Sequence, residues 1–208
     1  MDLIDFLIKE EWLKTPRIID AFRKIKRVDF LTEELKNLSE LNEALPIGFG
    51  QTISQPLVVA FMLEQLQPEP GEKILDVGSG SGWTTALLAE IVGLKGKIIS
   101  IELIPELKEF GEKNVSKYNF ISKGIVKFVC SDGSKGFKRE APFDKILASA
   151  ATDKIPDFWK EQLNIGGRIV APVNSSILTL KNKQLANGEA IFEEKEHKGF
   201  VFVPLITK

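Results

Sequence analysis

The sequence predicts a single α/β domain with a mainly parallel central sheet flanked by helices, preceded by further helices and followed by a meander of strands. The first observation is that strand-length apolar runs alternate with helical patterns from residue 73 onward, which is typical of parallel sheets. The second is the length, since 208 residues suit one domain with a modest addition. We expect N-terminal helices and a loop over 1–66, the core over 67–173 and C-terminal strands over 174–208.

The N-terminal part is predicted to be helical because apolar residues recur there at helical spacing. The expected helices span 3–13, 16–25, 32–38 and 56–66. Pro16 suits a first helical turn, and Thr32 is the expected cap of the third helix.

The segment 44–63 carries no charge and is long enough to span a bilayer. Its first half contains Pro, Gly and polar residues that would break a helix in lipid, so we interpret it as a loop running into a helix. Asp2 and Asp5 stand where a secretory signal carries basic residues. We therefore expect a cytoplasmic protein without a membrane partner.

The remaining elements alternate and then change character. Strands are expected over 73–77, 97–101, 125–130 and 143–148. Helices are expected over 82–92, 105–118 and 155–163, the last ending near 166–167. In the tail, strands are expected over 168–173, 177–181, 190–194 and 200–205.

Composition excludes several kinds of site. With 28 basic and 29 acidic residues the net charge is -1, which argues against a surface devoted to nucleic acid. Cys130 is the only cysteine, so no intramolecular disulfide or cysteine-based zinc site is possible, and we expect a small buried residue. His197 is the only histidine, and its charged neighbours predict a solvated position. No metal site is expected.

The most informative motif is the glycine-rich turn at 76–82 (DVGSGSG), between an expected strand and an expected helix. Glycines allow a sharp turn and let a ligand approach the N–H groups that open the helix. The spacing departs from the dinucleotide pattern G-x-G-x-x-G, because Trp83 stands where its third glycine would be. Asp76 would repel a pyrophosphate, so a cationic ligand suits the turn better. A turn of this kind can also be only a tight turn.

Two further acids follow the next two expected strands. Glu102 comes 20 residues after Gly82, where a carboxylate can accept both hydroxyls of a ribose. Asp132 follows the third strand and can accept a hydrogen bond from an exocyclic amine. Because parallel strands end at one edge of the sheet, the three acids describe a site for an adenosine carrying a positive group. S-adenosylmethionine is such a ligand.

Residues 45–56 (LPIGFGQTISQP) resemble the signature loop of the protein-L-isoaspartate O-methyltransferases. The resemblance includes RVDF at 27–30, APFD at 141–144, GGR at 166–168 and FVPL at 202–205, and so covers nearly the whole chain in order. It implies a Rossmann-like, S-adenosylmethionine-dependent methyltransferase fold. It also implies methylation of the free carboxylate of L-isoaspartyl residues in damaged proteins, which starts their repair, and leaves D-aspartyl acceptors open.

The same resemblance implies the site residues. Ser54 is the expected active-site residue. The expected cofactor-binding residues are Thr52, Ile53, Asp76, Gly78, Ser79, Gly80, Gly82, Glu102, Leu103, Asp132 and Gly133. An acceptor carboxylate is already ionised at neutral pH, so alignment in a partly dry site suffices and no general base is needed. The hydroxyl of Ser54 can aim that carboxylate through one hydrogen bond. Alternatively, Ser54 only caps the helix that starts near Pro56.

The chain departs from the family pattern at several positions. Glu40 and Asn42 stand where Tyr and Asp are usual, Trp83 where Tyr is frequent, and Asn174 where Gly is usual. These changes bear on substrate recognition more than on cofactor binding. Two alternatives stay open: a methyltransferase for another acceptor, such as a nucleic acid or small molecule, and a catalytically weakened cofactor-binding interaction module. Against nucleic acid stands the absence of a motif for a flipped base. We expect a monomer acting on isoaspartyl proteins or peptides.

Overall fold

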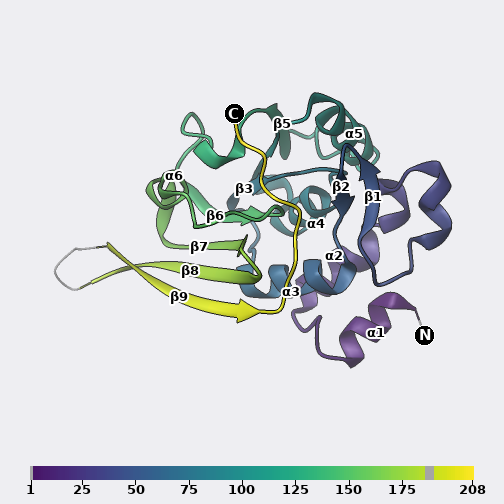
Figure 1. Ribbon diagram of the computed structural model, residues 1–208, viewed down its shortest axis with the longest axis horizontal. Helices are drawn as coiled ribbons and strands as arrows, with labels where there is room; N and C mark the ends of the chain where they lie inside the picture. Colours follow the sequence, from purple (N-terminus) through teal and green to yellow (C-terminus); the bar gives the residue numbers. More distant parts are fainter. Residues whose placement is uncertain (1, 186–189) are drawn as a thin grey trace.

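A seven-stranded sheet forms the centre of the computed structural model, which describes residues 2–185 and 190–208 (Figure 1). The strand order is β5-β4-β3-β6-β7-β8-β9. The bounds are β3 Lys73–Val77, β4 Lys97–Glu102, β5 Val126–Cys130, β6 Phe143–Ala148, β7 Leu163–Val173, β8 Ser176–Gln184 and β9 Ala190–Lys198. Neighbouring strands from β5 to β7 are parallel, whereas β7, β8 and β9 are antiparallel. The predicted fold class is confirmed.

Helices cover both faces of the sheet (Figure 1). Their bounds are α1 Leu3–Lys9, α2 Pro16–Lys24, α3 Pro56–Leu66, α4 Trp83–Val92, α5 Pro105–Ser116 and α6 Asp157–Glu161, with short 3-10 helices at Arg27–Phe30, Glu33–Leu38, Gly93–Lys95 and Gly133–Lys135. Alternate strand residues enter opposite layers. Ile74 and Ile98 pack in the core formed with α1 to α5, whereas Leu75 and Ile99 pack in the core that contains Trp159 of α6.

The uncharged segment is more ordered than a loop. It forms an antiparallel hairpin of β1 (Leu45–Gly48) and β2 (Gln51–Ile53), which leads directly into α3. Gly48 and Gly50 have φ values of 92° and 69°, in the region that favours glycine, and so allow the tight turn of the hairpin. Among the described residues, no helix is long and apolar enough to cross a membrane.

The structure corrects several of the expected elements. The helix expected over 3–13 ends at Lys9, and the strands expected over 177–181 and 190–194 span Ser176–Gln184 and Ala190–Lys198. The helix expected over 155–163 ends at Glu161, and β7 instead begins at Leu163 and continues through a shift in its register with β6. The segment after Thr32 is a 3-10 helix, and the Thr32 side chain makes no cap hydrogen bond. The strand expected over 200–205 is wrong. That segment runs beside a loop rather than beside a strand. It makes one isolated bridge, between Pro204 and Ala151 of that loop.

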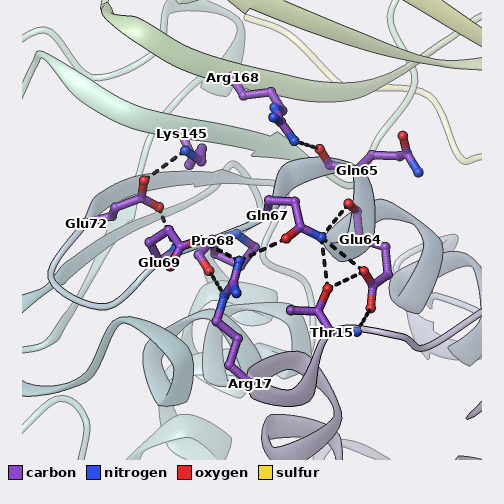
Figure 2. A network of polar contacts seen from close by, with 10 residues as sticks. All are labelled: Thr15, Arg17, Glu64, Gln65, Gln67, Pro68, Glu69, Glu72, Lys145 and Arg168. Carbon is purple, nitrogen blue, oxygen red and sulfur yellow. Dashed lines mark hydrogen bonds and ion pairs between the residues drawn. The ribbon is translucent and has the colours of Figure 1, made fainter.

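A polar network joins the N-terminal helices to the end of α3 (Figure 2). Oε2 of Glu64 accepts the Thr15 hydroxyl at 2.7 Å, while Oε1 accepts the Thr15 backbone N–H at 2.8 Å. Gln67, in a left-handed conformation just after α3, accepts a hydrogen bond from the Arg17 guanidinium at 2.9 Å. These contacts fix the C-terminal end of α3, and the opposite end of the helix faces the candidate site.

Candidate active site

A cavity lies at the carboxyl ends of β3 and β4, covered by the hairpin and by the C-terminal segment. Nine of the twelve residues predicted for the site line it: Thr52, Ile53, Ser54, Gly78, Ser79, Gly80, Glu102, Leu103 and Gly133. Among its described lining residues, the only charged side chain is that of Glu102. The cavity therefore favours a ligand that is neutral or positively charged near that carboxylate.

The Glu102 carboxylate holds the glycine turn in place. Its Oε2 accepts the N–H of Gly80 at 2.9 Å, and its Oε1 accepts the N–H groups of Leu103 and Ile104 at 2.8 and 3.0 Å. The residue is 7% exposed. A carboxylate offers about four acceptor positions, so the three backbone contacts leave room for a further hydrogen bond from a ligand hydroxyl.

The turn opens α4 without a side-chain cap. Gly82 occupies the cap position with φ 84°, and no described side chain accepts from the N–H groups of the first turn. Ser81, Trp83 and Thr84 line the cavity, so this helix terminus is available to a ligand. Gly82 itself lies outside the lining. A Cβ there would stand 2.8 Å from the carbonyl oxygen of Gly111, so this glycine permits close packing of α4 on α5.

Asp76 also lies outside the lining, because it points into the layer of α4. It is fully buried, and its Oδ2 accepts hydrogen bonds from Thr85 at 2.5 Å and from Ser100 at 3.4 Å. Burial raises the pKa of Asp76 to about 6, opposed by these two hydrogen bonds. The carboxyl is thus ionised at neutral pH and adds negative charge beneath the turn. Its predicted direct contact with the cofactor stays a prediction.

Asp132 stands beside the cavity, and its carboxylate already has four polar contacts. Oδ1 accepts the N–H and the hydroxyl of Ser134 at 3.0 and 2.7 Å. Oδ2 accepts the N–H of Lys208 at 3.2 Å and lies 3.4 Å from Nζ of Lys135. Its neighbour Gly133 lines the cavity and packs so closely on Val77 that a Cβ would approach Cγ1 to 2.5 Å. Both neighbours of Asp132, Ser131 and Gly133, line the cavity, and the predicted contact of the Asp132 carboxylate with an amine remains a prediction.

Ser54 lies between β2 and α3, where two cavities meet. The second cavity is lined by Thr52, Ser54, Ser149 and Val203, which it shares with the first, and by Ala44, Gln55, Val58, Val201 and Phe202. No described residue hydrogen-bonds to the Ser54 hydroxyl, which is therefore free for a ligand. The alternative that Ser54 caps α3 is wrong, because the N–H of Leu57 is bound by Asn42 Oδ1 at 3.0 Å.

Comparison with known proteins identifies the family. The family described as "Protein-L-isoaspartate(D-aspartate) O-methyltransferase" matches residues 1–208. The chain belongs to this family. A protein-L-isoaspartate O-methyltransferase of Methanopyrus kandleri is 40% identical over 207 residues, covering 98% of this chain and 89% of its own. A protein-L-isoaspartate O-methyltransferase of Pyrococcus horikoshii is 40% identical over 204 residues, and the match covers 98% of this chain and 90% of the relative.

The fold agrees with that membership. A Plasmodium falciparum protein described as a protein-L-isoaspartate O-methyltransferase, solved in complex with S-adenosyl-L-homocysteine, has a TM-score of 0.86 at 20% identity, covering 99% of this chain and 97% of its own. The predicted family and methyltransferase fold are confirmed.

Sequence reasoning missed one wall of this methyltransferase's cavity. The C-terminal segment 203–206 lines the cavity. Ala151 holds it there, because its N–H donates to the carbonyl oxygen of Val203 at 2.8 Å and its carbonyl oxygen accepts the N–H of Leu205 at 2.7 Å. The signal for this wall is the FVPL match at 202–205, whose apolar pattern predicts a strand instead.

Two other predictions for this methyltransferase are wrong. Cys130 is exposed rather than buried, because β5 is an edge strand of the sheet. His197 is half-buried rather than solvated, and its ring lies edge-on to Phe61 at 5.0 Å between centroids. Burial lowers the pKa of His197, with a smaller effect from the charge of Lys195. Neither residue lines the two cavities.

Proposed function

We propose that this chain transfers a methyl group from S-adenosylmethionine to the free carboxylate of L-isoaspartyl residues in damaged proteins or peptides. The observation that carries the proposal is the position of Ser54, with an unoccupied hydroxyl, where the two cavities meet. The first cavity suits the methyl donor and the second suits the acceptor. Family membership supports the reaction type.

The residues of the first cavity fit the donor. Its described lining contains no Lys or Arg to neutralise a phosphate, and Glu102 is its only charged side chain. Together with Asp76 beneath the turn, this makes the site negative, which suits a sulfonium and disfavours a dinucleotide. Glu102 retains acceptor capacity for a ribose hydroxyl, and the first turn of α4 offers free N–H groups.

The protein's part in the reaction is alignment. The bound cofactor supplies an electrophilic methyl group. The acceptor carboxylate is ionised at neutral pH, so the site needs no general base. Ser54 donates one hydrogen bond that aims a carboxylate oxygen, and the apolar C-terminal segment, including Val203 and Leu205, excludes water around it.

The direct test is methylation with labelled S-adenosylmethionine of two matched peptides, one with isoaspartate and one with normal aspartate. We expect a base-labile methyl ester, detected as released methanol, on the isoaspartyl peptide alone. A protein that binds the donor and ignores both peptides would favour the alternative of another acceptor. A D-aspartyl peptide in the same assay tests the second substrate named in the family description.

A ligand experiment tests the donor site separately. S-adenosylhomocysteine should raise the melting temperature, because a ligand that binds only the native state stabilises it by about 2.7 kcal/mol at a hundred times its Kd. For a domain of this size the shift is roughly 5–10 °C. NADH should give no shift in parallel scans. Stabilisation by NADH alone would restore the dinucleotide interpretation.

The monomeric state stays a prediction. The absence of a nucleic-acid partner and the cytoplasmic location stay predictions.

A further inference from the structure

We propose that Asn42, held in place by Arg27, is a positioning residue for the reaction at Ser54. This inference rests on the proposed function. It concerns the segment 39–43, which precedes the hairpin and lies against the start of α3.

No described residue hydrogen-bonds to the Ser54 side chain, so its position follows from the backbone around it. The next residues open α3 in an unusual way. Gln55 stands at the cap position without a side-chain cap, and Pro56 has no N–H. The first N–H of α3 is therefore that of Leu57, and Asn42 Oδ1 accepts it at 3.0 Å.

Asn42 makes a second contact with the same turn. Its main-chain carbonyl oxygen accepts a hydrogen bond from Gln55 Nε2 at 2.8 Å. The two contacts attach to the first and third residues after Ser54. Asn42 thus acts as the cap of α3 from a remote segment. A shift of Asn42 would therefore move the backbone that carries the Ser54 hydroxyl.

Arg27 fixes the segment that carries Asn42. Its guanidinium donates to the carbonyl oxygens of Ser39, Leu41 and Glu43 at 3.2, 2.9 and 2.7 Å. It also donates to the carbonyl oxygen of Ser54 at 3.4 Å. One side chain therefore joins the residues on both sides of Asn42 to Ser54 itself.

The same guanidinium contacts a residue that lines the donor cavity. It lies 5.4 Å from the ring centre of Trp83, which lines that cavity. Arg27 is 6% exposed, and burial lowers its pKa to about 10, opposed by the charge of Glu40. The side chain is therefore charged at neutral pH. Its five N–H donors suit a cluster of carbonyl oxygens, and a Lys side chain could not replace it there.

The decisive comparison is between Asn42→Ala and Asn42→Asp, assayed with isoaspartyl peptide and S-adenosylmethionine. Asn42→Ala should lower kcat about five- to tenfold, the effect of losing one cap hydrogen bond, while the Kd for S-adenosylhomocysteine stays unchanged. Asn42→Asp keeps an acceptor for the N–H of Leu57 and should retain kcat. Equal losses in both variants would overturn the proposal.

Two controls separate positioning from general stability. Thr15→Ala removes a hydrogen bond to Glu64 at the other end of α3 and should lower the melting temperature without changing kcat of the folded enzyme (Figure 2). In a Ser54→Ala background, Asn42→Ala should cause no further loss of kcat, because it acts through Ser54. An undiminished loss in that background, or a lower melting temperature with unchanged kcat, would overturn the proposal.

Hydrogen exchange tests the proposal independently of activity. In Asn42→Ala the amide of Leu57 should exchange faster than in wild type, whereas Thr15→Ala should leave it unchanged. Unchanged exchange in Asn42→Ala would overturn the positioning role. A wild-type protein that methylates no isoaspartyl peptide would refute the proposed function while the exchange experiment still decides the role of Asn42.

Discussion

Replacing Ser54 by alanine should leave a folded protein that binds S-adenosylhomocysteine normally and has lost most methyl transfer. The hydroxyl stands where the two cavities meet, and Asn42 rather than Ser54 caps α3. The loss in kcat should be about ten- to a hundredfold, the range for one hydrogen bond to a charged group that is used in the transition state. The measurement is methanol released from the ester formed on isoaspartyl peptide.

The controls for Ser54 use the same preparations. The melting temperature should change little, since no described residue loses a hydrogen bond to the hydroxyl. Ser54→Thr keeps the hydroxyl and adds a methyl group near the acceptor, so its kcat should fall between those of the wild type and Ser54→Ala. A wild-type level of kcat in Ser54→Ala would show that the serine has no part in aligning the acceptor.

The core of the fold could be predicted because it depends on local patterns. Each strand from β3 to β6 is a short apolar run, and each helix between them has a clear start. The segment 200–205 has a similar apolar pattern and is not a strand, because a strand also needs a neighbour to pair with. Sequence spacing does not reveal that, among the described residues, this segment forms only one isolated bridge, with Ala151.

The candidate site could be predicted where it follows the strand ends. The glycine turn and Glu102 meet because β3 and β4 are parallel neighbours in register. The direction of Asp76 follows from strand alternation, which places it on the same face as Ile74 and toward α4. The contacts of Arg27 with carbonyl oxygens of a distant segment leave no pattern in the sequence, since any residue supplies a carbonyl.

Removal of the Glu102 carboxylate should have the largest effect on the donor site, because this group has two functions. It binds the backbone N–H groups of Gly80, Leu103 and Ile104, and it retains an acceptor position toward the cavity. Glu102→Ala should raise the Kd for S-adenosylhomocysteine about ten- to a hundredfold or more. It should also lower the free energy of unfolding by roughly 1–3 kcal/mol, because buried N–H groups lose their acceptor.

The two functions of Glu102 can be separated by titrating S-adenosylhomocysteine well below the melting temperature and measuring unfolding on the same samples. Glu102→Gln keeps one acceptor oxygen but turns an amide donor toward backbone N–H groups, so both losses should be intermediate. Glu106→Ala, an identical change at an exposed position in the first turn of α5, is the matched control and should alter neither quantity. A lower stability with an unchanged Kd in both Glu102 variants would mean that the carboxylate holds the glycine turn and does not contact the cofactor. The ribose would then depend on backbone groups and on the first turn of α4, which lines the same cavity.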